Sequence, residues 1–143
     1  MGFLGKLLLG NGTLRAPLRQ ELEAEGLVRI EEDLHGSVRY EHFKAPGKRF
    51  HGKITPERIG LGISEQRVVA YCRSGRSKLV DSPFSSPRFD MVTITADDDH
   101  VEFLVDYDKG DEPKFSGKVK IRIEHPEAAT IAREITGRIG HDR

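Results

Sequence analysis

The residues best suited to chemistry are six histidines and one cysteine, and their spacing assembles no active site. The histidines stand at positions 35, 42, 51, 100, 125 and 141, so no two share a helical face and none pairs with Cys72. Because a nucleophile needs a neighbouring base and zinc needs clustered ligands, we predict no catalytic residue, no metal site and no cofactor. A site assembled through tertiary contacts is the alternative. The single cysteine excludes an intrachain disulfide and fits a reducing compartment.

Two acidic runs contain ligands for a hard cation, but neither has the spacing of a calcium loop. The run at 106–112 begins like an EF-hand, which needs a bidentate glutamate at its twelfth position, and that position is Gly117. The run at 97–99 consists of consecutive aspartates, whose side chains point in different directions in a turn. We therefore expect both runs to be solvated hairpin loops.

Charge is the more informative signal, because zero net charge conceals two opposed blocks. Residues 44–78 hold nine basic and two acidic side chains, a net +7, whereas residues 79–113 hold two basic and ten acidic ones, a net −8. In the positive block the basic residues crowd around two turns, Pro46-Gly47 and Ser74-Gly75. Phe50 is the only aromatic residue in the first group, which argues against nucleic acid as a partner. The candidate anion-binding residues are Lys44, Lys48, Arg49, Lys53, Arg73, Arg76 and Lys78.

Hydrophobic periodicity predicts a short N-terminal helix and then a series of strands. Thr13 can cap a helix that carries leucines on one face and ends at Gly26. From residue 27 the period changes from 3.6 to 2, which indicates strands. We expect His35-Gly36 to be a turn and Pro56 to interrupt a strand. The expected strands are 27–31, 37–43, 48–54, 58–63, 67–72, 78–81, 89–95, 101–107 and 118–123.

The last predicted element is an amphipathic helix at 126–139. Pro126 and Glu127 suit its first turn, and apolar side chains then recur at the spacing of one helical face. Such a stripe is expected to dock on the sheet. At 143 residues the chain should form one core, which we divide into an N-terminal apolar segment with a short helix at 1–26 and a β domain at 27–143.

The hairpin at 63–71, which reads ISEQRVVAY, resembles a hairpin of bacterial pleckstrin-homology-like (PH-like) and GRAM-like domains, with conservative departures at Ile63, Ser64 and Val68. The order of about seven antiparallel strands followed by one amphipathic helix is similar to that fold over residues 27–139. The resemblance implies a mainly β protein with terminal helices, in which a β-sandwich or partly open barrel is capped by the C-terminal helix. A lipocalin-like or other small barrel is the structural alternative.

The resemblance also implies a role for the first basic group. In PH domains that bind phosphoinositides, basic residues on an early hairpin loop grip the phosphates, and Lys44, Lys48, Arg49 and Lys53 could do likewise. We therefore predict a non-catalytic binding module, not an enzyme, that engages an anionic membrane surface or a protein partner through its basic loops. The expected location is cytoplasmic, at the inner face of a membrane. The alternative is a small-molecule carrier or an enzyme with a cavity inside the barrel.

Overall fold

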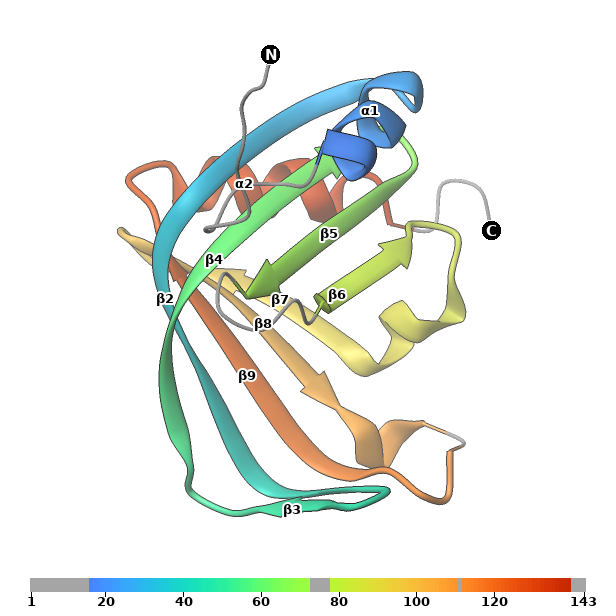
Figure 1. The fold of residues 1–143 in the computed structure, drawn as a ribbon, viewed down its shortest axis with the longest axis vertical. Coiled ribbons are helices and arrows are strands. Elements are labelled where there is room, and N and C mark those ends of the chain that lie inside the picture. Colours follow the sequence, from blue (N-terminus) through green and yellow to red (C-terminus); the bar gives the residue numbers. More distant parts are fainter. Residues whose placement is uncertain (1–15, 73–77, 111, 140–143) are drawn as a thin grey trace.

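The computed structural model describes residues 16–72, 78–110 and 112–139 of the chain. In this part, seven antiparallel strands form one strongly curled sheet, a half-barrel, with a helix before the first strand and another after the last (Figure 1). The predicted mainly β fold with terminal helices is confirmed. The strands of the sheet, in their spatial order, are β6 (Lys78–Pro83), β5 (Arg67–Cys72), β4 (Ile54–Ser64), β2 (Leu27–Ala45), β9 (Ser116–Glu124), β8 (His100–Asp106) and β7 (Val92–Ala96), and the short β3 (Lys48–Phe50) pairs with β2.

β2 is one continuous strand of 19 residues, where the sequence predicted two strands joined by a turn at His35-Gly36. It bends across the sheet and pairs with β4 on one side and β9 on the other. Gly36 lies within this strand. A side chain does not fit at this position, because a Cβ there would collide with the backbone carbonyl oxygen of Arg122 on β9. The glycine that suggested a turn therefore marks a close approach of two backbones.

The strand predicted at 48–54 is also wrong. β3 covers only its first three residues, and β4 begins at Ile54. Pro56 lies inside β4 and does not interrupt it. At this point β4 pairs with β2 alone, since its pairing with β5 starts at Ile59, so Pro56 occupies a stretch of edge strand, where proline is tolerated.

The segment between β6 and β7 contains a 3-10 helix, η1 (Pro87–Met91), where the sequence predicted the start of a strand at Phe89. The Ser86 hydroxyl caps this helix by accepting a hydrogen bond from the backbone N–H of Arg88. Phe89 is buried and stacks on Phe84, with ring centroids 6.0 Å apart. The helical turn therefore inserts an aromatic side chain into the core before β7 begins.

The N-terminal helix α1 (Ala16–Ala24) packs on the face of β5 that is opposite the main core. Its Leu22 is fully buried against Val69 and Tyr71. The helix is followed by Gly26, whose φ of +92° suits glycine and confirms the predicted end. The predicted cap, Thr13, and the apolar segment before it lie outside the described residues.

The C-terminal helix α2 (Ala128–Thr136) is shorter than the predicted helix at 126–139, and it packs on β7 and β8. Its Ile131 and Ile135 are fully buried. Arg29 of β2 holds the helix from the other side, because its guanidinium donates to both carboxylate oxygens of Glu134, at 2.7 and 3.0 Å. These hydrogen bonds to Glu134 raise the pKa of Arg29, against the opposing effect of burial.

Candidate functional site

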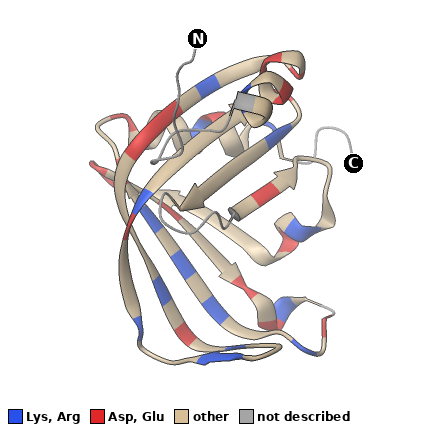
Figure 2. Ribbon diagram, in the orientation of Figure 1, with Lys and Arg blue, Asp and Glu red and all other residues tan. Residues whose placement is uncertain are grey.

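Four of the predicted anion-binding residues gather on the hairpin formed by β2 and β3 and on the segment that follows β3. Figure 2 shows Lys and Arg at the tip of this hairpin, at one end of the sheet. Lys44 and Arg49 are direct cross-strand partners. Within the described part of the chain, none of the four forms an ion pair with a carboxylate. The four exposed residues, which we call the basic hairpin surface, are Lys44, Lys48, Arg49 and Lys53.

The position of this hairpin is fixed by a bulge in β2. The bulge lies between Glu41 and Lys44, where His42 takes a φ of 51°. Gly117 of β9 lies against it with a φ of +86°, and a Cβ at that position would collide with the carbonyl group of His42. Only glycine therefore allows β9 to meet the bulge at this point.

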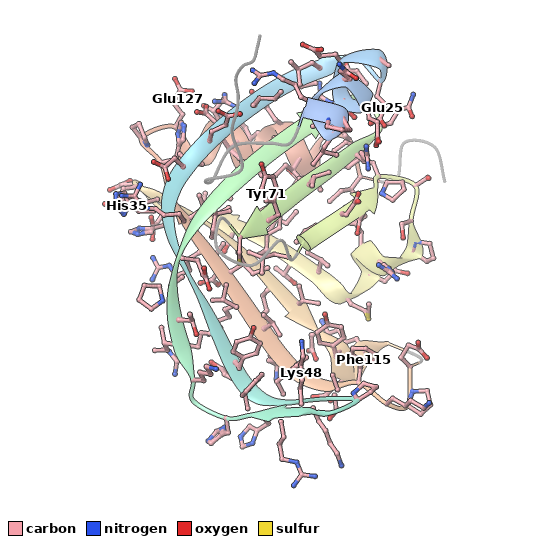
Figure 3. All side chains as sticks on the ribbon, viewed as in Figure 1. Glu25, His35, Lys48, Tyr71, Phe115 and Glu127 are labelled. Carbon is pink, nitrogen blue, oxygen red and sulfur yellow. The ribbon has the colours of Figure 1, made fainter. Side chains whose placement is uncertain are left out.

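An aromatic cluster anchors the hairpin to the rest of the sheet. Phe43 and Phe50 are cross-strand partners, and their ring centroids lie 5.3 and 4.9 Å from that of Tyr40. Phe43 also contacts Tyr107 of η2 (Tyr107–Lys109), which stacks on Phe115 at 5.5 Å. Each aromatic contact stabilises by about 0.5–1.5 kcal/mol beyond burial. The hairpin is therefore firmly held, and Lys48 and Phe115 lie at the same end of the molecule (Figure 3).

Two histidines extend the basic hairpin surface, and the sequence analysis missed their proximity. His42 and His51 stack with ring centroids 4.0 Å apart, and Nδ1 of His51 accepts a hydrogen bond from the backbone N–H of His42. Both lie the same number of residues from the centre of the Pro46-Gly47 turn, so the register of the hairpin brings them together. That symmetry about a predicted turn was the signal available in the sequence.

Most of the second predicted basic group, around the Ser74-Gly75 turn, lies outside the described residues. Arg73 and Arg76 lie outside the described residues, and of Lys78, the first residue of β6, only the backbone is described. Two other arginines of the positive block have structural partners. Arg58 binds Asp33 of β2 at 3.1 Å, and Arg67 binds carboxylates of α1 and β6. Among the described residues, the structure places the first predicted group, and the side chains of the second lie outside what it describes.

The acidic block of the sequence is divided in space. Residues 97–99 form the turn between β7 and β8, at the far end of β9 from the hairpin, about 25 Å away along the strand. Asp106 and Asp108 lie at the hairpin end, where Asp106 accepts the backbone N–H of Asp108 and Asp108 accepts that of Gly117. These two carboxylates cap backbone groups, so the opposed charge blocks are only partly separated in the fold.

The residues with reactive side chains are in ordinary structural environments. Burial, and to a smaller extent Glu57, raises the pKa of the Cys72 thiol to about 11, so it is protonated at neutral pH and a poor nucleophile. Asp97, Asp99 and His100 bring ligand atoms within 4.8 Å of one another in the β7–β8 turn. There Asp97 accepts the backbone N–H groups of Asp99 and His100, as in an ordinary capped turn.

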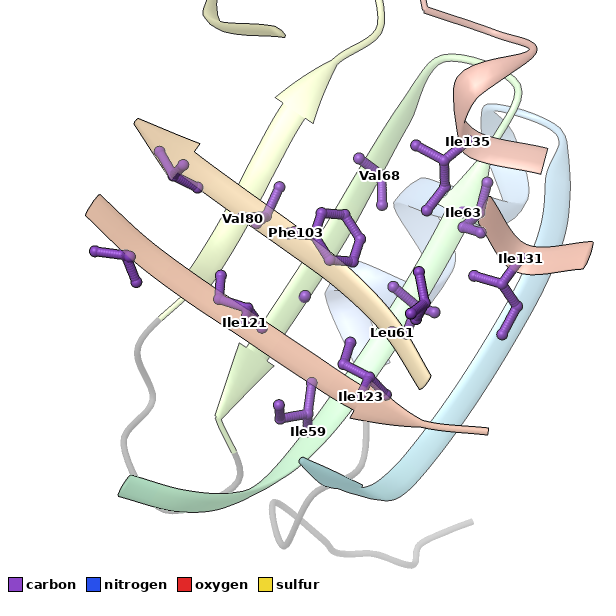
Figure 4. Close-up of a cluster of buried hydrophobic side chains, with 14 of the residues drawn as sticks. Ile59, Leu61, Ile63, Val68, Val80, Phe103, Ile121, Ile123, Ile131 and Ile135 are labelled. Carbon is purple, nitrogen blue, oxygen red and sulfur yellow. The ribbon is translucent and has the colours of Figure 1, made fainter. Parts of the chain in front are cut away.

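The interior of the half-barrel is filled by side chains (Figure 4). Leu61 of β4, Phe103 of β8 and Ile121 of β9 meet in one cluster, which Ile131 and Ile135 of α2 close at one side. A cavity of about 530 Å³ adjoins this cluster through Val80 and Val105, between the edge strands β6 and β7. Among the described residues, space for a ligand therefore exists at the open side of the sheet.

No protein-family model matches the chain. None of the curated proteins matches it either. In the part of the chain that the structure describes, neither helix is long and apolar enough to cross a membrane. The basic hairpin surface and the cavity are therefore considered on their own geometry.

Proposed function

We propose that this protein is a non-catalytic binding module of the PH-like type that attaches to an anionic membrane surface through the basic hairpin surface. One observation carries the proposal: four exposed cations share one hairpin, and no carboxylate in the described part of the chain pairs with them. The PH-like assignment is supported by the order of the elements, seven strands of one curled sheet followed by a single packed helix.

The arrangement of Lys44 and Arg49 favours a bound anion. Like charges directly opposite each other on neighbouring strands repel, at a cost of a few tenths of a kcal/mol or more. A phosphate or carboxylate between the two side chains would replace this repulsion with attraction. Because the bulge and the aromatic cluster already fix the hairpin, little backbone order would be lost on binding.

A membrane is favoured over a soluble anion by the neighbouring surface. Ile54, the residue after Lys53, is 57% exposed and is one of the few large apolar side chains exposed in the described part of the chain. An isoleucine beside a row of cations suits the boundary between lipid headgroups and acyl chains. Lys53 also lies 4.4 Å from the centroid of the Phe50 ring, which holds its ammonium group on this side of the hairpin.

The expected affinity is modest. Each Lys or Arg near an anionic leaflet contributes about 1 kcal/mol, so four contribute about 4 kcal/mol, which corresponds to a dissociation constant on the order of 1 mM in lipid. The attraction decays over about 8–10 Å at physiological salt, so only groups at the surface contribute. Attachment would therefore be reversible and sensitive to ionic strength.

Vesicle co-sedimentation tests the proposal. Wild-type protein should sediment with vesicles that contain about one-third phosphatidylserine, and binding should fall as NaCl is raised from about 50 to about 500 mM. The variant Lys48→Glu/Arg49→Glu should lose binding. The control Arg19→Glu/Arg133→Glu makes the same change in net charge on α1 and α2 and should retain it.

Two results would contradict the proposal. The first is no sedimentation of the wild type with any anionic composition, which would leave a protein partner as the target of the hairpin. The second is equal loss of binding in both double variants, which would show that total charge, and not the basic hairpin surface, drives attachment.

A further inference from the structure

The open side of the half-barrel contains a site that is separate from the basic hairpin surface. β6 and β7 are the two edges of the sheet, and they do not pair with each other. The chain crosses from one edge to the other through η1, and the cavity of about 530 Å³ lies between them. Cavities that bind small molecules usually measure about 300–1,000 Å³, so this one has the size of a ligand site.

The walls of the cavity are mainly apolar. They come from both edge strands, from β8, from η1 and from the loop before β9. The side chains of this wall are partly or fully buried, so a ligand in contact with them would lose much of its exposure to water. The apolar residues are Leu79, Val80, Met91, Val92, Val105 and Phe115.

The polar groups that line the cavity differ in their existing partners and in their exposure. Asp81 is already engaged by Arg67 at 3.0 Å, and Glu112 is exposed on its loop. Arg88 and Tyr107, from η1 and η2, lie on the two 3-10 helices that contact each other. Neither the guanidinium of Arg88 nor the hydroxyl of Tyr107 has a hydrogen-bond partner among the described residues.

Tyr107 remains a hydrogen-bond donor at neutral pH. Burial raises the pKa of its phenol, and the nearby positive charge of Arg88 opposes part of that rise. Both residues line the cavity, and the two 3-10 helices that carry them contact each other. An uncharged donor and a cation thus face the same apolar cavity.

We propose that the seam between β6 and β7 binds a single-chain amphiphile with an anionic head group. Its apolar chain lies against the edge strands, and its head accepts hydrogen bonds from Arg88 and Tyr107. The chemistry of the lining selects this class, since an apolar body matches the six apolar side chains and an anion matches the guanidinium of Arg88. The site needs no membrane and does not include the basic hairpin surface.

A methionine reporter makes the test direct. The chain contains only two methionines, Met1 and Met91, and Met91 lines the cavity, so labelling the methionine methyl groups with ¹³C places an NMR probe in the wall. Dodecanoate should give a saturable shift of the Met91 signal. It should bind about tenfold more tightly than dodecanol, because it adds charge-assisted hydrogen bonds. Dodecylamine should bind more weakly than either.

Paired variants separate the head group from the chain. Arg88→Gln should remove the tenfold preference for dodecanoate and leave dodecanol binding unchanged, whereas Lys109→Gln, which removes a cation of η2 outside the cavity, should keep the preference. Val92→Trp should fill the cavity and abolish binding of both compounds. Thr93→Trp is the matched control, since Thr93 is exposed, does not line the cavity and should leave binding intact.

The outcomes are distinct from those for membrane attachment. Lys48→Glu/Arg49→Glu should bind dodecanoate like the wild type, so failure of one proposal leaves the other standing. If Val92→Trp does not fold, as judged by circular dichroism, the comparison of wild type with Arg88→Gln still decides the role of the head group. Absence of a Met91 shift with every amphiphile would overturn the proposal. So would binding of dodecylamine or dodecanol as tight as that of dodecanoate.

Discussion

The arginines beside the two helices and the cations of the basic hairpin surface are similar side chains in opposite surroundings. Arg67 donates to Glu21 at 2.7 Å and to Glu25 and Asp81 at 3.0 Å, and only 14% of its side chain is exposed. The four hairpin cations are exposed and have no such partner in the described part of the chain. Arg29 repeats the first arrangement, with Glu31, Glu127 and Glu134 around a guanidinium that is 15% exposed.

The difference shows that a positive block in a sequence does not by itself locate an anion site. Arg67 belongs to the same block as Lys48 and Arg49, but its charge is neutralised by carboxylates from α1 and β6. Its role is structural, since it ties α1 to the sheet. What distinguishes the hairpin is that neither β2 nor β3 brings a carboxylate to its tip, so the cations there are available to a ligand.

Removing the partly buried arginine of the sheet should have the largest effect on stability. Arg67→Ala removes a guanidinium that pairs with three carboxylates, two of them mostly buried, and should lower the free energy of unfolding by about 3 kcal/mol. Urea unfolding at neutral pH measures this directly. Binding to anionic vesicles, tested where the variant is folded, should be unchanged.

Arg58→Ala provides the control for that experiment. Arg58 also pairs with a carboxylate, Asp33, but both side chains are substantially exposed, at 37% and 48%. Solvent-exposed pairs contribute about 0–1 kcal/mol, so the loss should be correspondingly small. Similar losses for the two variants would mean that the burial of Arg67 does not set its contribution.

Both stability and vesicle binding should depend on Gly117, which lies against the bulge at the base of the hairpin. Gly117→Ala should cost about 2 kcal/mol of unfolding free energy and weaken vesicle binding, because the new Cβ displaces the bulge at His42. Gly47→Ala is the matched control. Gly47 has a similar φ of +75°, but a Cβ added there would meet no atom within 4 Å, so this variant should show only the backbone strain. Equal costs would remove the collision with His42 from the explanation.

Raising the salt concentration should weaken vesicle binding by the basic hairpin surface but should change the stability contributed by Arg67 and Arg29 only slightly. Vesicle binding should fall at least about tenfold when NaCl is raised to about 500 mM, because the basic hairpin surface is open to counter-ions. The free energy of unfolding should change by less than about 1 kcal/mol, since the guanidinium groups of Arg67 and Arg29 are shielded by their partners. A large parallel loss of stability would show that these two guanidinium groups are as open to solvent as the hairpin.

The sequence predicted the strands best where one face is buried and the other is solvated. In β9, Val119, Ile121 and Ile123 are buried and alternate with more exposed lysine and arginine residues, so the period of two appears directly in the residue types. The same pattern over a helical period predicted α2. Its predicted ends were wrong, because the helix begins after Pro126 and Glu127 and stops before Ile139.

The predictions of secondary structure were wrong where the conformation of a residue depends on contact with backbone that is distant in the sequence. Gly36 is a frequent turn former, and its place inside β2 depends on Arg122, which is far away in the sequence. For the candidate site, the hairpin cations were predictable from their crowding around a turn. The roles of Arg67 and Tyr107 were not, since their partners come from other elements and no local pattern marks them.

Asp97 in the β7–β8 turn is a partnered negative charge, whereas Arg67 is a partnered positive one. Its replacement should give the smallest change in stability. Asp97 is 57% exposed, but its carboxylate accepts the backbone N–H groups of Asp99 and His100 and pairs with Arg122 at 3.1 Å. The hydrogen bond from Asp99 contributes most to lowering the pKa of Asp97. A carboxyl group with a lowered folded-state pKa stabilises above its unfolded pKa, and this contribution is lost as the pH falls through the folded value. Asp97→Asn should therefore be slightly less stable than the wild type at pH 7, and the difference should begin to shrink near about pH 4 and close below the folded pKa. Urea unfolding at pH 7 and below the folded pKa measures this difference in unfolding free energy. A difference that persists in acid would assign it to altered hydrogen bonding of the turn and not to the charge.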